Sequence, residues 1–212
     1  MLDRWTLRLV KRPLLKGASL LHRNGVTADQ VTLSGFGVGI CCLPALAMEW
    51  YGVALVFIVV NRIADGLDGE LARLAGPTDS GGFLDIVLDF VFYGSVVFGF
   101  ALADPSGNSL ASAALLFSFV GTGASFLAFS IMAERHGIEK IIYPTKGIYY
   151  LEGLAEGTET IIFLILFCLF PDAFVQLAYC FVFLCLVTVL TRAAGGYFIL
   201  KNMVAAVEQK KG

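Results

Sequence analysis

Long runs of apolar residues, separated by short polar breaks, make up most of this chain. The six runs lie near Val31–Met48, Val53–Ala72, Gly82–Ala103, Leu110–Ala133, Tyr149–Phe170 and Phe174–Leu200. A helix that crosses a bilayer needs about 20 mostly apolar residues, and each run approaches or exceeds that length. The pattern therefore predicts an all-α, polytopic membrane protein in which residues 31–200 form one domain of six transmembrane helices.

The composition excludes an ordinary soluble protein. Of the 212 residues, 58% are hydrophobic and only 15% are charged, and the mean hydropathy is +0.80. Soluble domains usually carry about 25% charged residues. The formal net charge of −2 conceals an uneven distribution of charge along the chain, and this distribution is more informative than the total.

Basic residues are confined to one set of loops and helix ends. The breaks at 49–52, 104–109 and 171–172 contain no Lys or Arg, whereas each of them contains an acid. Cytoplasmic ends of membrane segments carry the excess of Lys and Arg. We therefore expect both termini on the cytoplasmic side of a bacterial inner membrane, with residues 201–212 as a basic cytoplasmic tail.

Residues 1–30 combine basic and apolar side chains at helical spacing. Trp5 and Leu9 alternate with Arg4 and Arg8, and the same mixture continues to Arg23. This pattern predicts an amphipathic helix that lies on the surface of an anionic leaflet. The simpler alternative is a positive signal for membrane orientation and nothing more.

Four carboxylates interrupt the second and third apolar runs. They are Asp65, Asp68, Asp85 and Asp89. A charged side chain at the centre of a bilayer costs about 2.5–3.5 kcal/mol on insertion scales, so these acids require partners. The only nearby cations are Arg62 and Arg73. A bound divalent cation would compensate the remaining negative charge.

The spacing of the acids supports a shared site. Asp65 and Asp68 are three residues apart and Asp85 and Asp89 are four apart, so each pair lies on one face of its helix. A short turn over 74–80 makes the two helices antiparallel neighbours and places the pairs at one depth. Carboxylates without His or Cys suit Mg²⁺ or Mn²⁺ rather than zinc.

These residues also carry a resemblance to a known family. Asp65-x-x-Asp68-Gly69-x-x-Ala72-Arg73, followed by Gly81-x-x-x-Asp85-x-x-x-Asp89, resembles the signature of the CDP-alcohol phosphotransferases, which are integral membrane enzymes of phospholipid synthesis. All eight positions match. The segment from Thr27 to Thr32 is similar to the family's Thr-Pro-Asn-x-x-Thr, with Ala28 and Asp29 in place of proline and asparagine; this difference leaves open a ligand role for Asp29 or Thr32.

The resemblance implies a reaction in which an alcohol attacks a CDP-linked donor, most simply CDP-diacylglycerol, and CMP leaves. It implies that four acids hold Mg²⁺ or Mn²⁺, in two ions, and that Asp89 is also the general base. The metal ligands so implied are Asp65, Asp68, Asp85 and Asp89. The nucleotide-binding residues so implied are Asp65, Asp68, Gly69, Ala72, Arg73 and Gly81.

The acceptor site is expected farther along the chain. Candidate residues are Arg135, Lys140, Lys146, Glu156 and Glu159. Together with Glu152, the two glutamates fall at i, i+4 and i+7, which predicts one face of a membrane helix, where acids are usually functional. The cations would then bind an acceptor phosphate and the acids its hydroxyls. The alternative is that the cations mark the inner side and the acids pair with Arg192 or Lys146.

Two other classes of protein remain open at this point. A divalent-cation transporter would also place acids in membrane helices, but at mid-depth and on broken, repeated helices. A non-catalytic scaffold derived from the enzyme family would retain the fold without the reaction. For the enzyme, the partners expected are the CDP-linked donor, the alcohol acceptor and membrane lipids, with no nucleic acid; a homodimer is compatible with the sequence.

Overall fold

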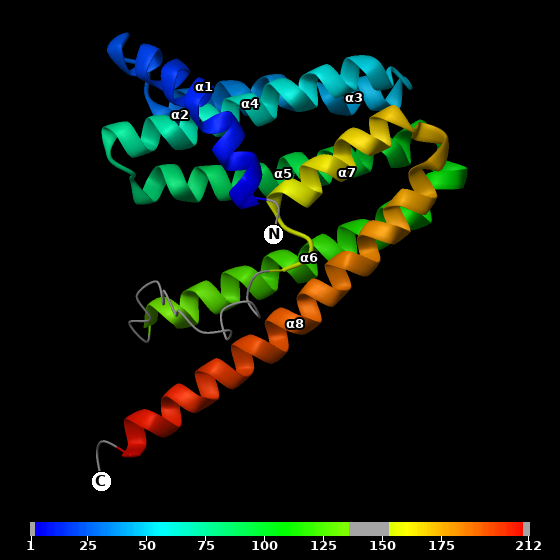
Figure 1. Ribbon diagram of the computed structural model, residues 1–212. Helices are drawn as coiled ribbons and strands as arrows, with labels where there is room; N and C mark the ends of the chain where they lie inside the picture. The colour runs from blue at the N-terminus through cyan, green and yellow to red at the C-terminus, as the bar shows by residue number, and fades with distance from the viewer. Residues whose placement is uncertain (1–2, 136–152, 210–212) are drawn as a thin grey trace.

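The computed structural model describes residues 3–135 and 153–209, and within these ranges the protein is helical and contains no strand (Figure 1). The helices are α1 (Asp3–Arg23), α2 (Ala28–Gly39), α3 (Cys42–Ala47), α4 (Tyr51–Ala75), α5 (Asp79–Ala103), α6 (Pro105–Arg135), α7 (Gly157–Leu169) and α8 (Phe174–Gln209), with a 3-10 turn, η2 (Pro171–Ala173), before α8. The all-α fold expected from the apolar runs is confirmed.

Four helical segments are long and apolar enough to cross a membrane. They are Ala28–Ala47, Asp79–Ala103, Pro105–Arg135 and Pro171–Asn202. Large apolar side chains such as Phe83, Leu110 and Phe117 lie exposed on these segments, where a bilayer would cover them. Helix α4 carries the charged residues of the second apolar run, and α7 is short. The chain is therefore a helical membrane protein.

The first predicted span consists of two helices, α2 and α3, that are separated at Ile40 and Cys41. Pro44 explains the break, because proline has no N–H to donate to the carbonyl four residues earlier and its ring collides with that carbonyl. The carbonyl of Ile40 accepts instead from the Leu43 N–H at 3.0 Å. The polypeptide thus continues in the same direction with a local irregularity.

The expected helix over Tyr149–Phe170 is wrong in its first part. Helix α7 begins at Gly157, with Glu156 as its N-cap residue, and residues 149–152 lie outside the described ranges. Its 13 residues rise about 20 Å at 1.5 Å per residue, which is less than the ~30 Å hydrocarbon core. At the other end of the chain, α8 extends beyond the predicted boundary at Leu200.

Close contact between α2 and α4 depends on glycine. A Cβ on Gly35 would collide with the Cβ of Ala64, and a Cβ on Gly39 would lie 2.7 Å from that of Asn61. The Asn61 side chain uses this proximity to donate a hydrogen bond to the Gly35 carbonyl at 3.1 Å. Because Gly35 and Gly39 have no side chains, the backbone of α2 packs directly against Asn61 and Ala64 of α4. These two residues lie just before Asp65, the first of the four acids.

An aromatic core holds the opposite end of the bundle together. Phe100 stacks on Phe174 with ring centroids 4.5 Å apart, and Phe163 stacks on Phe181 at 4.4 Å. The junctions α3–α4, α5–α6 and α7–α8 gather at this end, whereas the turn between α4 and α5 lies at the other end (Figure 1). Asp68 and Asp85 therefore lie on the side of the α4–α5 turn, and Asp65 and Asp89 lie near the middle of α4 and α5.

Candidate active site

Three of the four predicted acids form one group. The carboxylates of Asp65 and Asp68 on α4 and of Asp85 on α5 each place an oxygen within 4.8 Å of the other two. The turn after α4 makes this possible, because Gly76 adopts φ +98°, a conformation that side-chain-bearing residues rarely adopt. Thr78 then caps α5 by accepting a hydrogen bond from the Gly81 N–H at 3.1 Å.

Asp68 is the most buried member of this group and is held from α2. The Thr32 hydroxyl donates to Asp68 Oδ2 at 2.6 Å. Thr32 lies three residues before Gly35, so the close α2–α4 contact brings the hydroxyl to the acid. The sequence left a ligand role open for Thr32, and the structure shows its hydroxyl bound to one of the acids.

Asp89 lies apart from this group because an arginine holds it. Arg62 Nη2 donates to Asp89 Oδ1 at 2.7 Å, and Arg62 Nη1 donates to the Tyr93 hydroxyl, also at 2.7 Å. Tyr93 donates in turn to the other oxygen of Asp89 at 3.2 Å. The guanidinium is 3.6 Å from Asp65 and packs over the Phe92 ring at 4.8 Å. The positive charge of Arg62 therefore compensates mainly the charge of Asp89 and, at longer distance, that of Asp65.

The second nearby cation does not join the acids. Arg73 pairs with Glu70 one helical turn earlier, and its side chain is 63% exposed. Arg73 also does not line the cavity that opens beside the acids. Arg62 is therefore the sole basic partner of the four acids among the residues the structure describes, and the excess of negative charge is larger than the sequence indicated.

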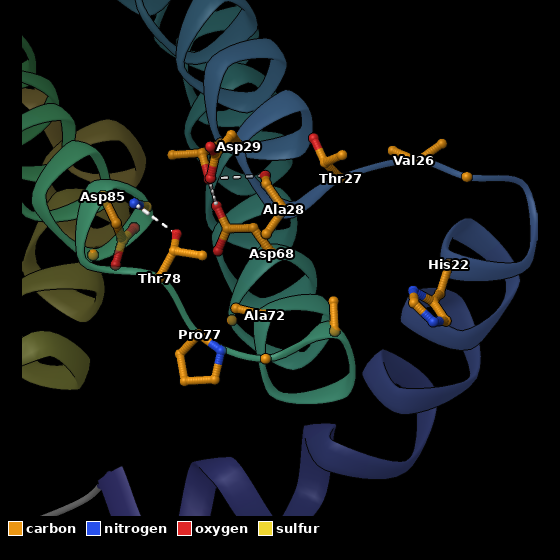
Figure 2. Close-up of a pocket in the computed structure, with 17 residues that line it drawn as sticks. His22, Val26, Thr27, Ala28, Asp29, Asp68, Ala72, Pro77, Thr78 and Asp85 are labelled. Atoms are coloured by element: carbon orange, nitrogen blue, oxygen red, sulfur yellow. Dashed lines mark hydrogen bonds between the residues drawn. The ribbon is translucent and has the colours of Figure 1, made fainter.

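A cavity of about 520 Å³ opens beside the group of three acids (Figure 2). Asp68 and Asp85 lie at its edge, and Gly69, Ala72 and Gly81 line its wall. Gly69 has no side chain and Ala72 has a small one, so the backbone of α4 is open to a bulky ligand here. Asp29, at the start of α2, also lines this cavity, and its carboxylate lies against Gly81. We call this space the α2–α5 cavity.

A second cavity of about 400 Å³ lies on the other side of Asp85, among α5, α6, α7 and α8. Asp85 and Asp89 line one part of it, and Glu156 and Arg192 line another. We call this space the α5–α8 cavity. Because Asp85 borders both cavities, molecules in the two spaces would meet at the acids.

A small space of about 10 Å³ is lined by all four acids and Arg62, and it shares Asp85 with both cavities. A volume of this order accommodates about one water molecule or an ion of similar size. Several oxygen donors around a space of this size suit Mg²⁺ or Mn²⁺, which prefer carboxylate and water ligands. The residues present therefore fit a divalent cation.

The residues predicted to bind the acceptor do not lie together in the described part of the structure. Lys140 and Lys146 lie outside the described ranges, and Arg135 is exposed at the end of α6. The alignment of Glu152, Glu156 and Glu159 on one helix face is wrong, because α7 begins only after Glu156. Glu156 and Glu159 instead form a reciprocal capping box at the start of α7.

The alternative pairing of these acids with Arg192 is confirmed for Glu156. Arg192 Nη2 lies 3.2 Å from Glu156 Oε1, and both side chains are mostly buried. Sequence reasoning missed Tyr93 altogether. Its position four residues after Asp89, on the same face of the helix, was the available signal.

Fold and site together define an integral membrane protein with a carboxylate centre between two cavities. Residues 26–206 match the family model described as CDP-alcohol phosphatidyltransferase. The chain belongs to this family, whose members are membrane transferases of phospholipid biosynthesis, and the resemblance seen in the sequence is confirmed.

Similar proteins extend this assignment. The inner membrane protein YnjF of Escherichia coli (strain K12) is 51% identical over 203 residues, which cover 96% of this chain and 98% of YnjF. Archaetidylinositol phosphate synthase of Pyrococcus horikoshii is 34% identical over 94 residues, covering 44% of this chain and 50% of that protein. The phosphatidylinositol phosphate synthase of Mycobacterium tuberculosis with CDP-DAG bound has the same fold, with a TM-score of 0.65, 19% identity, and coverage of 88% and 94% of the two chains.

We predict that the ion pair between Arg62 and Asp89 stabilises the folded protein. Replacing Arg62 by Met leaves Asp89 without its main partner, so we expect a loss of up to about 3–5 kcal/mol in the free energy of unfolding. In the Arg62→Met background, the further change Asp89→Asn should recover part of this loss. Denaturant unfolding of the purified variants in detergent measures each value, with Arg23→Met, at an exposed arginine, as the matched control. Strict additivity of the two changes would contradict the coupling.

Proposed function

We propose that this protein transfers a phosphatidyl group from CDP-diacylglycerol to an alcohol, with release of CMP, in phospholipid biosynthesis. The observation that carries this proposal is the group formed by Asp65, Asp68 and Asp85 at the junction of two cavities. Membership of the family supports the general reaction. The Mycobacterium tuberculosis phosphatidylinositol phosphate synthase, which has the same fold, was solved with CDP-DAG bound, and this supports the choice of donor.

The cofactor we propose is Mg²⁺ or Mn²⁺, in two ions held by the four acids. A second Mycobacterium tuberculosis structure of the same fold is described in complex with manganese and citrate. When bound, such cations neutralise the charge that builds up on transferring phosphoryl oxygens. Asp65, Asp68 and Asp85 are the principal metal ligands in this proposal. Asp89, which is also bound to Arg62, is the fourth ligand.

The α2–α5 cavity is the proposed site of the nucleotide end of the donor. Its volume of about 520 Å³ lies within the usual range of roughly 300–1,000 Å³ for ligand sites. Gly69, Ala72 and Gly81 line its wall, and Asp68 and Asp85 line it at the proposed position of the diphosphate. Asp65 does not line this cavity, but its carboxylate lies close to those of Asp68 and Asp85. Arg73 was expected here from the family signature; its exposed pairing with Glu70 favours a role at the rim.

The proposed chemistry is one displacement at phosphorus. The acceptor hydroxyl oxygen forms a bond to the phosphorus that carries the diacylglycerol group, and the bond from this phosphorus to the oxygen of CMP breaks. CMP leaves with the electron pair of that bond. The hydroxyl proton passes to the carboxylate of Asp89, which Arg62 and Tyr93 hold toward the α5–α8 cavity.

Two other functions are less well supported by the site. A cation transporter typically carries its acids on broken, repeated helices, whereas α4 and α5, which carry all four acids, are each continuous over 25 residues. A non-catalytic scaffold would not need a group of acids bordering two cavities. Release of CMP separates the three functions, because a transporter and a scaffold do not produce it.

The first test of the enzyme is metal-dependent release of CMP. We expect purified protein, supplied with CDP-diacylglycerol, Mn²⁺ or Mg²⁺ and a panel of alcohols, to release CMP and form a new lipid. Chelation should abolish this release, because the group of acids would then lack its cations. Chromatography of CMP and mass spectrometry of the lipid provide the measurement. Full activity in excess EDTA would rule out the metal role.

A second prediction separates the roles of the acids. Changing Asp65 to Asn should weaken binding of the CDP-lipid as well as turnover, because the diphosphate loses a bridging cation. Changing Asp89 to Asn should lower single-turnover rates by about 10²–10⁴, the usual contribution of a general base, while affinity for the CDP-lipid is retained. Equilibrium binding and single-turnover kinetics on the same folded variants measure both effects. Equal losses of binding in the two variants would overturn the role of Asp89 as base.

We also propose the expected topology: six membrane spans, the N-terminal helix α1 on the membrane surface, and both termini and the site on the cytoplasmic side of an inner membrane. The description of YnjF as an inner membrane protein supports this location. The helix junctions that lack Lys and Arg lie together at one end of the bundle (Figure 1), which supports the orientation. A homodimer remains a prediction from the sequence.

This topology predicts which side of the membrane two exposed serines occupy. In a variant without its five native cysteines, Ser109→Cys near the start of α6 should react with an impermeant thiol reagent added from the periplasmic side. Ser80→Cys near the start of α5 should react only after the membrane is permeabilised. Both serines are exposed, so burial does not account for a difference. Labelling of both from the same side would contradict the six-span arrangement.

A further inference from the structure

Arg62 lies between two acids that the proposed function uses in different ways. Its guanidinium is 2.7 Å from the Asp89 carboxylate and 3.6 Å from that of Asp65. Asp89 is the proposed general base, whereas Asp65 is a proposed ligand of the metal. If the guanidinium moved toward Asp65, it would compete with a divalent cation for that carboxylate, because the attraction between opposite charges grows as they approach. The position of Arg62 therefore affects the binding of metal.

Asn61 holds one edge of the Arg62 guanidinium. Nε and Nη2 of Arg62 both donate to Asn61 Oδ1, the first at 2.9 Å. Nη2 also donates to Asp89 Oδ1 at 2.7 Å. The guanidinium is a rigid plane with its N–H donors in a fixed arrangement, so one amide oxygen that binds two of its nitrogens limits how the whole group can turn.

Tyr93 holds the other edge of the guanidinium. Its hydroxyl accepts from Arg62 Nη1 at 2.7 Å and donates to Asp89 Oδ2 at 3.2 Å. Nη1 is also the nitrogen that lies 3.6 Å from Asp65, which is too far for a hydrogen bond. Because the guanidinium is bound at both edges, it cannot approach Asp65 more closely without losing hydrogen bonds.

Asn61 is itself fixed by the close contact between α2 and α4. Its side chain donates to the Gly35 carbonyl at 3.1 Å and lies against Gly39, and the residue is only 5% exposed. Asn61 also lines the small space that all four acids line. A buried amide whose donor and acceptor are both used is costly to disturb. The packing of α2 on α4 therefore fixes the guanidinium through this one amide.

We propose, on the basis of the metal centre proposed above, that Asn61 is a positioning residue that keeps Arg62 on Asp89 and away from Asp65. Asn61 acts through Arg62 in this proposal and does not bind the metal. Without the amide, Nε and Nη2 of Arg62 lose a shared acceptor, and the guanidinium turns toward Asp65, the other carboxylate paired with it in the described part of the chain. The affinity of the site for a divalent cation then falls.

Binding of Mn²⁺ to the purified full-length protein, measured without CDP-lipid, tests this role. Electron paramagnetic resonance of free Mn²⁺ gives the dissociation constant. We expect Asn61→Ala to raise this constant about tenfold or more, a factor typical of one hydrogen bond to a charged group. Asn108→Ala is the matched control, because Asn108 also donates to a backbone carbonyl, that of Phe100 at 2.9 Å. An unchanged constant in Asn61→Ala, or an equal rise in Asn108→Ala, would overturn the proposal.

A double variant separates positioning of Arg62 from a general structural effect. In the Arg62→Met background no guanidinium is present to move, so adding Asn61→Ala should leave the Mn²⁺ dissociation constant within about twofold of that of Arg62→Met alone. A tenfold weakening in both backgrounds would mean that Asn61 does not act through Arg62, and the proposal would be wrong.

A milder variant serves if Asn61→Ala or Arg62→Met does not fold. Tyr93→Phe removes only the hydroxyl that holds the other edge of the guanidinium, so it should also raise the Mn²⁺ dissociation constant. Tyr179→Phe, at an exposed tyrosine, is its control and should bind Mn²⁺ like the wild type. Wild-type affinity in Tyr93→Phe would contradict the proposed restraint on Arg62.

The same measurements distinguish this proposal from the proposed function. If the wild-type protein binds Mn²⁺ saturably and the variants bind it equally well, only the role of Asn61 is overturned, and the metal centre and the release of CMP stay supported. If the wild-type protein shows no saturable binding of Mn²⁺, both the metal centre and the role of Asn61 are overturned.

Discussion

The cost of keeping carboxylates ionised among apolar helices is the constraint on which this site depends. A buried charge is tolerated when a partner or a hydrogen bond compensates it. Asp89 has Arg62 and Tyr93, and Asp68 has the Thr32 hydroxyl. The three acids grouped at the junction of the cavities have fewer partners than charges, which gives the site its affinity for divalent cations in our proposal.

The same constraint explains why helix contacts near the site are so close. The contact of Gly35 with Ala64 allows α2 to deliver Thr32 to Asp68. The Gly76 turn returns the chain so that Asp85 meets the acids of α4. Small residues thus have two effects: they allow the backbones to approach, and around the α2–α5 cavity they leave room for a ligand.

The two cavities differ in the balance of charge along their walls. Asp29, Asp68 and Asp85 give the α2–α5 cavity an acidic wall, which suits a diphosphate only when cations lie between them. In the α5–α8 cavity, Asp89 pairs with Arg62 and Glu156 pairs with Arg192.

The sequence by itself determined the class of protein and most of the acid group. Apolar runs and the 3.6-residue period of helices are local properties, so they predicted the helices that carry the site and the shared faces of Asp65 with Asp68 and of Asp85 with Asp89. The family signature likewise lies within one stretch of chain. Even the break at Ile40 and Cys41 has a local cause, the proline at position 44.

Only the tertiary structure decided how the charges are paired. Arg62 and Arg73 are similar in sequence context, yet Arg62 turns to Asp89 across the helix pair, while Arg73 turns to Glu70 on its own helix. Glu156 meets Arg192 from 36 residues away. The periodicity that predicted a helix face for Glu156 did not show that the helix begins after it. Such choices depend on which helices pack together and on which side chains remain without water, and neither is encoded in local spacing.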